Sequence, residues 1–365
     1  MSLEFSVERN PHPASDAERE KILANPGFGN HFTDHMVSIE WNGTYDGGGQ
    51  WSDAKVIPYG PLSLDPAAAV LHYGQEIFEG IKAYRHEDGS VYTFRPEDNA
   101  KRLQASARRL ALPELPEELF VESLKQLVAI DEKWVPSGEG EALYLRPFMI
   151  ATEAYLGVRP SHQVKFLVIA SPAGNYFGSP KPVNIWLSTK YARAGVGGTG
   201  FAKCGGNYAA AMMGQIEAEA HGCQQVIFKD PNRDDAIEEL GGMNVFFVFG
   251  KENKIVTPEL TGTILEGITR RSLLQLAQDR GMTVEERKFT LDEWKHSLED
   301  GSLTEVAACG TAAVVAPFGR LIAEDFELPA AFDGFGEISQ SLRDELVGIQ
   351  TGTVQDPHHW LVKLV

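Results

Sequence analysis

Lys203 stands in a stretch that is unusually rich in glycine, "GGTGFAKCGGNYAAAMMGQIEAEAHG", which spans residues 197–222. Glycine lets another molecule approach the backbone closely. A lysine that forms a Schiff base with a flat cofactor needs such an approach, together with a hydroxyl that donates to the phenolic oxygen of the cofactor. Tyr208, which follows the second group of glycines, is a candidate for that donor. The alternative is an ordinary lysine in a surface turn.

Other parts of the sequence offer partners for the phosphate and the ring nitrogen of such a cofactor. The segment "TGTILEGITRRSLLQLA" predicts a helix that begins near Ile268 and Thr269, and the free N–H groups of a helix N-terminus bind anions. Arg102 either binds the same phosphate or lies on a solvated helix face. Glu239 precedes two glycines and an apolar strand, so it is either the partner of a protonated ring nitrogen or a loop carboxylate.

The glycine-rich loop also contains the pattern G-x-G-x-x-G, at Gly195, Gly197 and Gly200. In a Rossmann unit this pattern binds the pyrophosphate of a dinucleotide, and the helix opens inside the pattern. Here Lys203 and two more glycines precede the helix. This departs from the Rossmann arrangement. A dinucleotide-dependent oxidoreductase or a non-catalytic nucleotide-binding protein is the alternative class, and it rests only on these three glycines. The two histidine pairs of the chain lack the partners of a zinc site, and we expect no metal site.

The composition is that of an ordinary soluble globular protein, with 43% hydrophobic and 23% charged residues. A length of 365 residues favours two domains. The formal net charge of -18 argues against nucleic acid or an anionic membrane as a partner. No segment resembles a signal peptide or a membrane span. Three cysteines without a CxxC pair indicate free thiols in a reducing compartment. We therefore expect a cytoplasmic protein.

Strands and helices are mixed along the chain, which predicts a mixed α/β protein. After an extended arm of about thirty residues, helices are expected at 95–112, 116–135, 268–281 and 338–352, with another from Asn207. Strands are expected at 35–41, 90–94, 142–152, 164–172, 183–189, 224–230, 244–250 and 283–289. The Gly/Pro-rich stretch 174–181 is the predicted interdomain loop. It separates a smaller N-terminal domain, 1–173, from a larger C-terminal domain, 182–365, which carries Lys203.

Eight strings of the sequence, taken together, match one known family. They are "FTDHM", "LHYGQEIFEGIKAYR", "FRPEDNAKRL", "YLRPFMI", "KCGGNYAA", "EELGGMNVFF", "ILEGITRRSLL" and "ACGTAA", in that family's order and at about its spacing. The chain resembles the branched-chain amino-acid aminotransferases, pyridoxal-phosphate enzymes of fold type IV. The resemblance implies a two-domain α+β fold, similar to that of D-amino-acid aminotransferase, with the active site between the domains. It implies transfer of the amino group of leucine, isoleucine or valine to 2-oxoglutarate, which gives branched-chain 2-oxo acids and glutamate.

The resemblance also implies roles for individual residues. Around pyridoxal 5'-phosphate it implies that Lys203 forms the Schiff base, that Tyr208 donates to the phenolate and that Glu239 pairs with the pyridinium nitrogen. It implies a further arginine near the cofactor, Arg193. The residues implied to hold the phosphate are Arg102, Ile268, Thr269 and Thr311. Around the substrate it implies a side-chain pocket of Phe78, Tyr144, Arg146 and Tyr176, with Thr311 and Ala312 at the α-carboxylate. Tyr73 and Val158 match positions that the partner subunit supplies, which implies a homodimer with shared active sites.

Two features depart from the mammalian members of the family. Ala313 and Ala316 occupy the positions of a CxxC motif, so we expect no thiol switch. Gly242 stands where those members have threonine, so one hydroxyl contact to the cofactor is missing. Within the fold, a D-amino-acid aminotransferase or an aminodeoxychorismate lyase is the alternative, because both keep the lysine and the glutamate. The strings "FEGIKAY" and "YLRP" and the long N-terminal arm favour the branched-chain enzymes.

Overall fold

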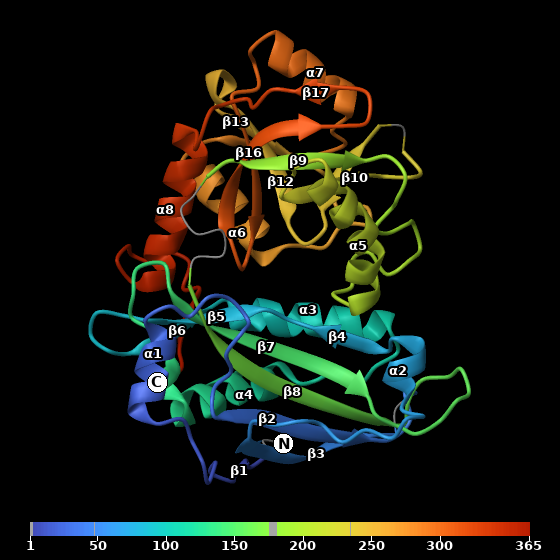
Figure 1. Cartoon of the computed structure of the whole chain (residues 1–365), viewed down its shortest axis with the longest axis vertical. Helices are drawn as coiled ribbons and strands as arrows, with labels where there is room; N and C mark the ends of the chain where they lie inside the picture. Colours follow the sequence, from blue (N-terminus) through green and yellow to red (C-terminus); the bar gives the residue numbers. More distant parts are fainter. Residues whose placement is uncertain (1–2, 47, 175–180, 234) are drawn as a thin grey trace. The chain divides into compact units, whose positions relative to one another are not determined.

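The computed structural model describes residues 3–46, 48–174, 181–233 and 235–365 (Figure 1). The chain divides into two compact units. The first unit holds the N-terminal part of the chain together with Ala202–Gly205 and Ile349–Val365, and the second holds the rest of the C-terminal half. Lys203 therefore belongs to the first unit. Most of the predicted interdomain loop lies outside the described residues, and the predicted domain limits, 1–173 and 182–365, stay predictions.

A nine-stranded sheet forms the centre of the first unit, in the order β1-β3-β2-β8-β7-β5-β6-β18, with β4 paired to β7 (Figure 1). Its strands are β1 (Ser6–Val7), β2 (His35–Asn42), β3 (Gln50–Pro58), β4 (Glu76–Phe78), β5 (Ile81–Arg85), β6 (Val91–Phe94), β7 (Ala142–Ala151), β8 (Gln163–Ala173) and β18 (Leu361–Lys363). The long antiparallel pair β7–β8 lies in the middle, and β18 joins the C-terminal end of the chain to β6. The site residues of this unit lie on β4, β7, α3 and α2, in the loop between β7 and β8 and in the segment Ala202–Gly205.

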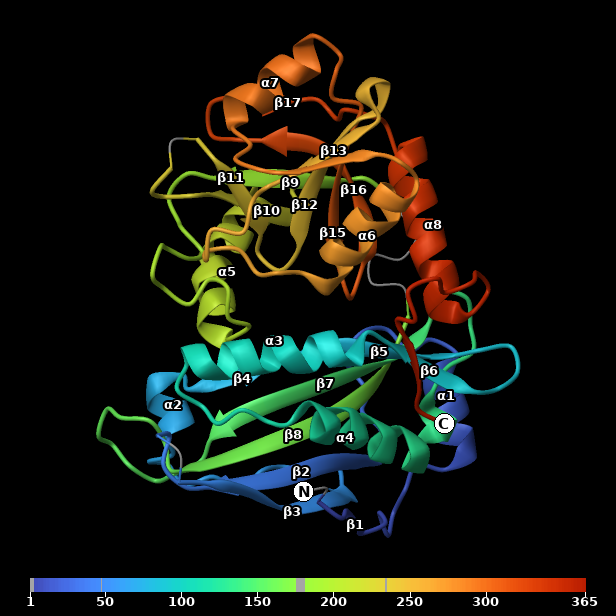
Figure 2. The same cartoon turned by 180° about the vertical axis from the view of Figure 1, so that it is seen from behind.

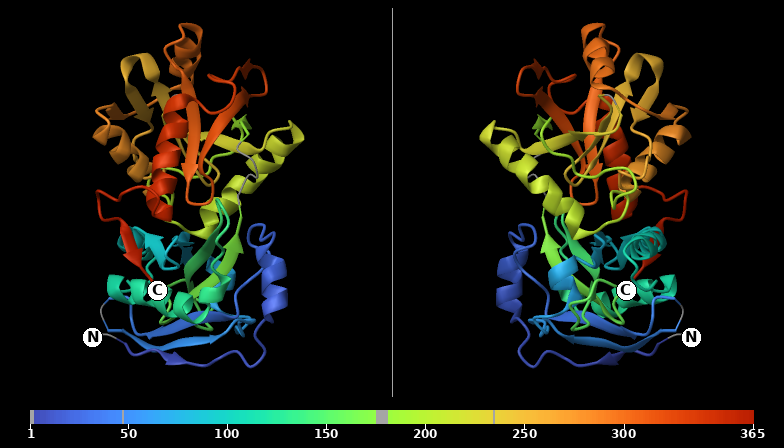
Figure 3. Two further views of the ribbon diagram at one scale, coloured as in Figure 1. Left: turned by 90° about the vertical axis from the view of Figure 1, so that its left-hand side faces the viewer. Right: turned by 90° about the vertical axis from the view of Figure 1, so that its right-hand side faces the viewer.

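Helices cover both faces of this sheet (Figures 2 and 3). The helices of the first unit are α1 (Asp16–Leu23), α2 (Ala69–Tyr73), α3 (Pro96–Arg109), α4 (Glu117–Ile130) and the 3-10 helix η1 (Glu132–Trp134). α3 and α4 lie on one face and α1 lies on the other. Leu103 of α3 and Phe120, Leu124 and Leu127 of α4 are fully buried in the core beside the sheet. Their helical spacing confirms the two helices predicted for this region.

The prediction of an extended N-terminal arm is wrong for Asp16–Leu23, which form α1. Ser15 and Glu18 make a capping box: the Ser15 hydroxyl accepts from the N–H of Glu18 at 3.3 Å, and the Glu18 carboxylate accepts from the N–H of Ser15 at 3.0 Å. These contacts satisfy two backbone donors at the start of the helix. The S-x-x-E pattern in the sequence was therefore the signal for this helix.

The second unit is also built on a nine-stranded sheet, in the order β11-β10-β9-β16-β15-β12-β13-β14, with β17 paired to β16. Its strands are β9 (Val183–Ser188), β10 (Gln225–Lys229), β11 (Ile237–Leu240), β12 (Asn244–Phe249), β13 (Lys254–Thr257), β14 (Thr283–Glu286), β15 (Glu305–Gly310), β16 (Val314–Ile322) and β17 (Glu327–Leu328). Its helices are α5 (Gly205–Ala220), α6 (Ile268–Asp279), α7 (Leu291–Glu299), α8 (Glu337–Thr351) and the 3-10 helix η2 (Gly250–Glu252). The first residue of α5 and the last three residues of α8 belong to the first unit. β11 and β12 are joined by a short turn, and β15 and β16 form a hairpin. The site residues of this unit lie on β11, in the turn between β15 and β16, at the start of α6, in the first turn of α5 and in the loop between β9 and α5.

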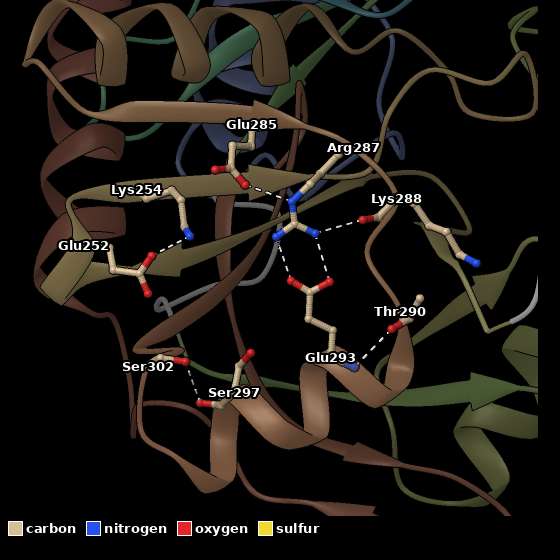
Figure 4. A network of polar contacts seen from close by, with 9 residues as sticks. All are labelled: Glu252, Lys254, Glu285, Arg287, Lys288, Thr290, Glu293, Ser297 and Ser302. Carbon is tan, nitrogen blue, oxygen red and sulfur yellow. Dashed lines mark hydrogen bonds and ion pairs between the residues drawn. The ribbon is translucent and has the colours of Figure 1, made fainter.

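A network of charged side chains ties β14 to α7 (Figure 4). The guanidinium of Arg287 binds both carboxylate oxygens of Glu293, at 2.7 and 2.9 Å, and one oxygen of Glu285 at 2.8 Å. These two carboxylates raise the pKa of Arg287. Thr290 caps α7, since its hydroxyl accepts from the N–H of Glu293 at 3.1 Å. The network holds the end of β14 against the start of α7.

No helix among the described residues has both the length and the apolar character needed to cross a membrane.

Candidate active site

The segment that carries Lys203 is held in the first unit through its own backbone groups. The N–H of Lys203 donates to Oγ of Ser106 on α3 at 2.9 Å, and its carbonyl accepts from the N–H of Phe78 at 2.9 Å. Nζ of the half-buried lysine lies 4.9 Å from the centre of the Phe78 ring. The amine is therefore presented from a fixed backbone, above an aromatic face.

Arg146 projects from β7 into the aromatic rings beside this lysine segment. Its guanidinium carbon lies 4.7 Å from the ring centre of Phe78 and 5.4 Å from that of Tyr144, and Nη2 donates to Oη of Tyr144 at 3.1 Å. Nε of Arg146 is buried and has no hydrogen-bond partner among the described residues. A buried donor without an acceptor costs free energy. The arrangement therefore suits an anionic group of a ligand beside Phe78, as the predicted substrate pocket requires.

Arg102 lies on α3, one turn before Ser106. Its Nε and Nη2 bind the two carboxylate oxygens of Glu79, at 2.8 and 2.7 Å, and Nδ2 of Asn99 donates to the same carboxylate at 2.7 Å. Glu79 is fully buried, and a buried carboxylate needs such partners. Two parallel N–H···O contacts hold the guanidinium in one orientation. The sequence predicted Arg102 but not Glu79, which is one of three charged residues in the string "EIFEGIKAY" and carries no signal of its own.

Tyr73 and Val158, the residues predicted to serve a partner subunit, are both exposed in the first unit. Tyr73 ends α2 and exposes 41% of its surface, and Val158 exposes 86%. The hydroxyl of Tyr73 donates to the carbonyl of Leu156, so α2 and the loop around Val158 lie side by side. Leu71, Leu156 and Tyr155 are exposed on the same two segments, which together form an apolar patch. Tyr176, the remaining pocket residue that was predicted, lies outside the described residues.

Glu239 lies on β11 in the second unit, where only 4% of its surface is exposed. One carboxylate oxygen pairs with Nη2 of Arg193 at 2.6 Å and accepts from the N–H of Leu265 at 3.0 Å. The other accepts from Nδ2 of Asn244 at 2.9 Å. An ionised carboxylate only accepts hydrogen bonds, and all three partners are donors. The structure thus brings Arg193 and Glu239 together, and it adds Asn244, which the sequence did not single out.

The N-terminus of α6 is formed by Ile268 and Thr269, as predicted. Gly267 precedes the helix, and no side chain caps it. The first N–H groups of a helix have no partner within the helix, and they carry its positive dipole end. Thr311 and Ala312 lie in the turn between β15 and β16, and both are half-buried. Both features offer backbone and hydroxyl donors to an anion.

Tyr208 lies in the first turn of α5 and is half-buried. A Cβ atom placed on Gly242 would lie 3.5 Å from Cε1 of Tyr208, which is an ordinary van der Waals contact. Gly242, the position where mammalian members have threonine, therefore stands beside the tyrosine ring. Because residue 242 is glycine, it places no side chain against this edge of the Tyr208 ring.

The pattern G-x-G-x-x-G lies in the loop between β9 and α5. β9 and β10 are parallel neighbours, so β9, α5 and β10 form a crossover like that of a nucleotide-binding unit. However, α5 begins only at Gly205, after Gly200 and the lysine segment. The helix therefore does not open inside the pattern, as a dinucleotide site requires. The geometry disfavours the alternative of a dinucleotide-dependent oxidoreductase.

The three cysteines are buried free thiols. Cys309 is 1% exposed on β15, and burial raises its pKa to about 12. Because the thiolate is the form that peroxide oxidises, we expect mild peroxide to leave the activity and all three free thiols intact. Titration of the thiols in denaturant, before and after treatment, measures this. Reversible inactivation with the loss of two thiols per chain would contradict the expectation.

Comparisons with known proteins identify the family of this chain. The family model for amino-transferase class IV matches residues 76–321. The branched-chain-amino-acid aminotransferase of Mycolicibacterium smegmatis is 60% identical, over 99% of this chain and 98% of that protein. The enzyme of the same name from Mycobacterium tuberculosis is 55% identical, over 100% of this chain and 99% of that protein.

A solved structure gives the same result for the fold. The T.th. branched-chain amino acid aminotransferase with pyridoxamine 5'-phosphate superposes with a TM-score of 0.73 and 27% sequence identity, over 90% of this chain and 99% of that one. The mixed α/β fold predicted from the sequence is therefore confirmed as the fold of these enzymes. The chain belongs to the class IV aminotransferases, and within them to the branched-chain-amino-acid aminotransferases.

Proposed function

We propose that this chain is a pyridoxal-phosphate-dependent transaminase that moves the amino group of leucine, isoleucine or valine to 2-oxoglutarate. The products are branched-chain 2-oxo acids and glutamate, and the reaction is reversible. The observation that carries the proposal is the buried carboxylate of Glu239, held by Arg193, Asn244 and the backbone of Leu265. Such a carboxylate is what a pyridine ring nitrogen needs in order to stay protonated.

The residues present fit pyridoxal 5'-phosphate. The uncapped N-terminus of α6 and the guanidinium of Arg102 suit its phosphate, and Glu239 suits its ring nitrogen. Thr311 and Tyr208 would add hydroxyl donors, and Lys203 supplies the amine for covalent attachment. When bound, the cofactor supplies an electron-withdrawing ring that stabilises negative charge at Cα of the amino acid. We assign these residues to one site from the family resemblance.

The chain's own residues would supply proton transfer and orientation. Nζ of Lys203 takes the proton from Cα of the amino acid and later donates one, so it acts first as base and then as acid. The buried contacts of Glu239 hold its carboxylate in place and make it a fixed negative partner. The hydroxyl and backbone donors at Thr311 and Ala312 orient the α-carboxylate of the substrate.

The side-chain pocket must accept both a branched apolar chain and the carboxylate of glutamate. Phe78 and Tyr144 supply apolar surface, and we assign Tyr176, Tyr73 and Val158 to the same pocket from the family resemblance. Arg146 supplies the cation for the second carboxylate, since its buried Nε has no partner among the described side chains and backbone groups. The pocket thus serves both substrates with different groups.

The exposed apolar patch around α2 supports a homodimer. Leu156 and Val158 expose 63% and 86% of their surfaces, and exposed apolar residues gathered in one place are typical of an interface. We propose that a second copy of the chain covers this patch and that Tyr73 and Val158 contribute to the site of the partner. We also propose a cytoplasmic location, because three buried free cysteines suit a reducing compartment.

The function is tested with a substrate panel. The purified protein, loaded with pyridoxal 5'-phosphate, is given 2-oxoglutarate and one amino acid at a time, and glutamate formation is followed. We expect activity with leucine, isoleucine and valine, and a yellow protein with a visible absorption band. A colourless protein that gains no visible absorption band with added pyridoxal phosphate would contradict the proposal.

The variant Arg146→Met tests how one pocket accepts two substrates. Loss of a hydrogen bond to a charged group costs roughly 1.5–3 kcal/mol, so we expect KM for 2-oxoglutarate to rise at least about tenfold. The half-reaction with leucine, which brings no second carboxylate, should change much less. Single-turnover absorbance measurements with each substrate separate the two effects. Equal losses in both half-reactions, with lower stability, would indicate that Arg146 is only structural.

A further inference from the structure

The peptide N–H of Gly205 donates to the carboxylate of Glu76, which lies 129 positions earlier in the chain. Gly205 is the first residue of the 16-residue helix α5, and Glu76 is the first residue of β4. Both residues belong to the first unit. A negative charge at the N-terminus of a helix is stabilised by the free N–H groups and by the helix dipole. The contact therefore anchors the start of α5 to β4.

This contact acts together with two others that hold the four residues Ala202–Gly205. The other two are the bonds of the Lys203 backbone to Ser106 and to Phe78, each 2.9 Å long. Glu76 and Phe78 are two positions apart on β4 and so lie on the same face of the strand. β4 therefore binds the lysine segment twice on the C-terminal side of the Lys203 Cα atom, and Ser106 of α3 binds it on the N-terminal side.

The carboxylate explains one of the two glycines that follow Cys204. A Cβ atom on Gly205 would collide with Oε1 of Glu76, whereas a Cβ atom on Gly206 would meet no heavy atom within 4 Å. Glycine is common at the start of a helix, so the helix alone does not explain why only one of the two glycines is crowded. At Gly205 a Cβ atom would fit only if the Glu76 carboxylate moved away.

Glu76 is a partly buried acid with a charged neighbour. Burial raises its pKa, while the N–H of Gly205 and the charge of Arg146 act in the opposite direction. The acid thus lies between the helix N-terminus and the arginine of the substrate pocket. Its contact is with the backbone of Gly205 and not with the amine of Lys203.

We propose that Glu76 is a positioning residue for Lys203: its carboxylate anchors the N–H of Gly205 and thereby fixes the backbone from which the lysine amine projects. This role rests on the proposed function, in which Lys203 binds the cofactor covalently. It explains why a strand so far away in sequence carries a glutamate at this position, and why the residue after Cys204 has no side chain.

The test compares four variants of the full-length chain, with and without bound cofactor. Glu76→Ala removes the anchor, and Glu76→Gln keeps an acceptor oxygen without the charge. Gly205→Ala displaces the carboxylate, and Gly206→Ala is its matched control. Hydrogen exchange of the Gly205 and Lys203 amides reports the anchor itself. Titration with pyridoxal 5'-phosphate reports cofactor affinity, and steady-state kinetics with leucine report kcat and KM.

We expect Glu76→Ala and Gly205→Ala to lower the protection of the Gly205 amide and the affinity for pyridoxal 5'-phosphate by at least about tenfold, since a hydrogen bond to a charged group is lost. In both variants kcat should fall while KM for leucine changes little. Glu76→Gln should restore most of the protection, and Gly206→Ala should resemble the wild type in exchange.

Unchanged protection of the Gly205 amide in Glu76→Ala would overturn the proposal. Lost protection with unchanged cofactor affinity and kcat would also overturn it, because the anchor would then not position the lysine. Attachment of the cofactor to a lysine other than Lys203 would overturn the proposed function, and with it the role of Glu76, whatever the exchange data show. The failures of the two proposals are therefore distinguishable.

Discussion

Replacement of Lys203 with alanine is expected to lower the turnover number by at least about 10⁴-fold, at the upper end of what one positioned acid–base group contributes. The variant loses both the amine that attaches the cofactor and the group that moves the Cα proton. The fold should persist, because the contacts that hold this segment, to Ser106 and Phe78, use the backbone and not the side chain. Steady-state glutamate formation and thermal unfolding measure the two effects.

Lys190→Ala is the matched control for this variant. Lys190 is an exposed lysine of the second unit, whose amine lies 3.6 Å from the carboxylate of Glu217. An exposed ion pair contributes little to stability, so this variant should retain wild-type turnover. Comparable losses in both variants, or residual turnover near the wild-type value in Lys203→Ala, would show that Lys203 is not the reacting lysine.

The second large effect is expected for Glu239→Gln. A neutral amide cannot hold the proton on a pyridine nitrogen, so we expect turnover to fall about 100- to 1,000-fold, as on loss of a fixed charge-stabilising contact. Cofactor affinity should fall much less, because the α6 N-terminus and Arg102 are unchanged. The amide also fits its surroundings poorly, because its NH₂ group would face Nδ2 of Asn244, which is itself a donor. Asn244 is held in this orientation, since Nδ2 also donates to the carbonyl of Leu265 at 3.0 Å.

Glu238→Gln gives the control, since the same substitution is made one residue earlier. Glu238 is 2% exposed, and its side chain points to the opposite side of β11 from that of Glu239. Burial raises its pKa to about 7, so much of it is already uncharged at neutral pH. The amide should therefore change turnover little. A similar loss in both variants would indicate damage to the strand rather than loss of the charge of Glu239.

Helices and strands with a clear pattern could be predicted from the sequence. α3, α4 and α6 follow the helical spacing of apolar residues, and the apolar runs of β7, β8 and β12 are strands. Several other strands were not predicted, among them β3 and β18. β18 has only three residues, and its place depends on pairing with β6, more than 250 residues earlier. Such long-range pairing leaves no local signal in the sequence.

Sequence prediction of the site had the same limit. Lys203, Glu239 and Arg102 carry local signals, because glycines, an apolar strand or a helix surrounds each of them. Glu76 and Glu79 do not, since their roles come from partners on other elements, Gly205 and Arg102. A buried charge must find a partner, but the sequence does not say which one. The three-dimensional arrangement supplies that partner.

The central claim, that Lys203 is the residue to which pyridoxal 5'-phosphate binds, is tested most directly by borohydride reduction of the cofactor-loaded wild-type protein. Reduction fixes the cofactor to its lysine, and mass spectrometry of the digested protein identifies the modified peptide. We predict a single modified peptide that contains Lys203. A cofactor fixed to any other lysine, or no modified peptide from a yellow protein, would contradict the account.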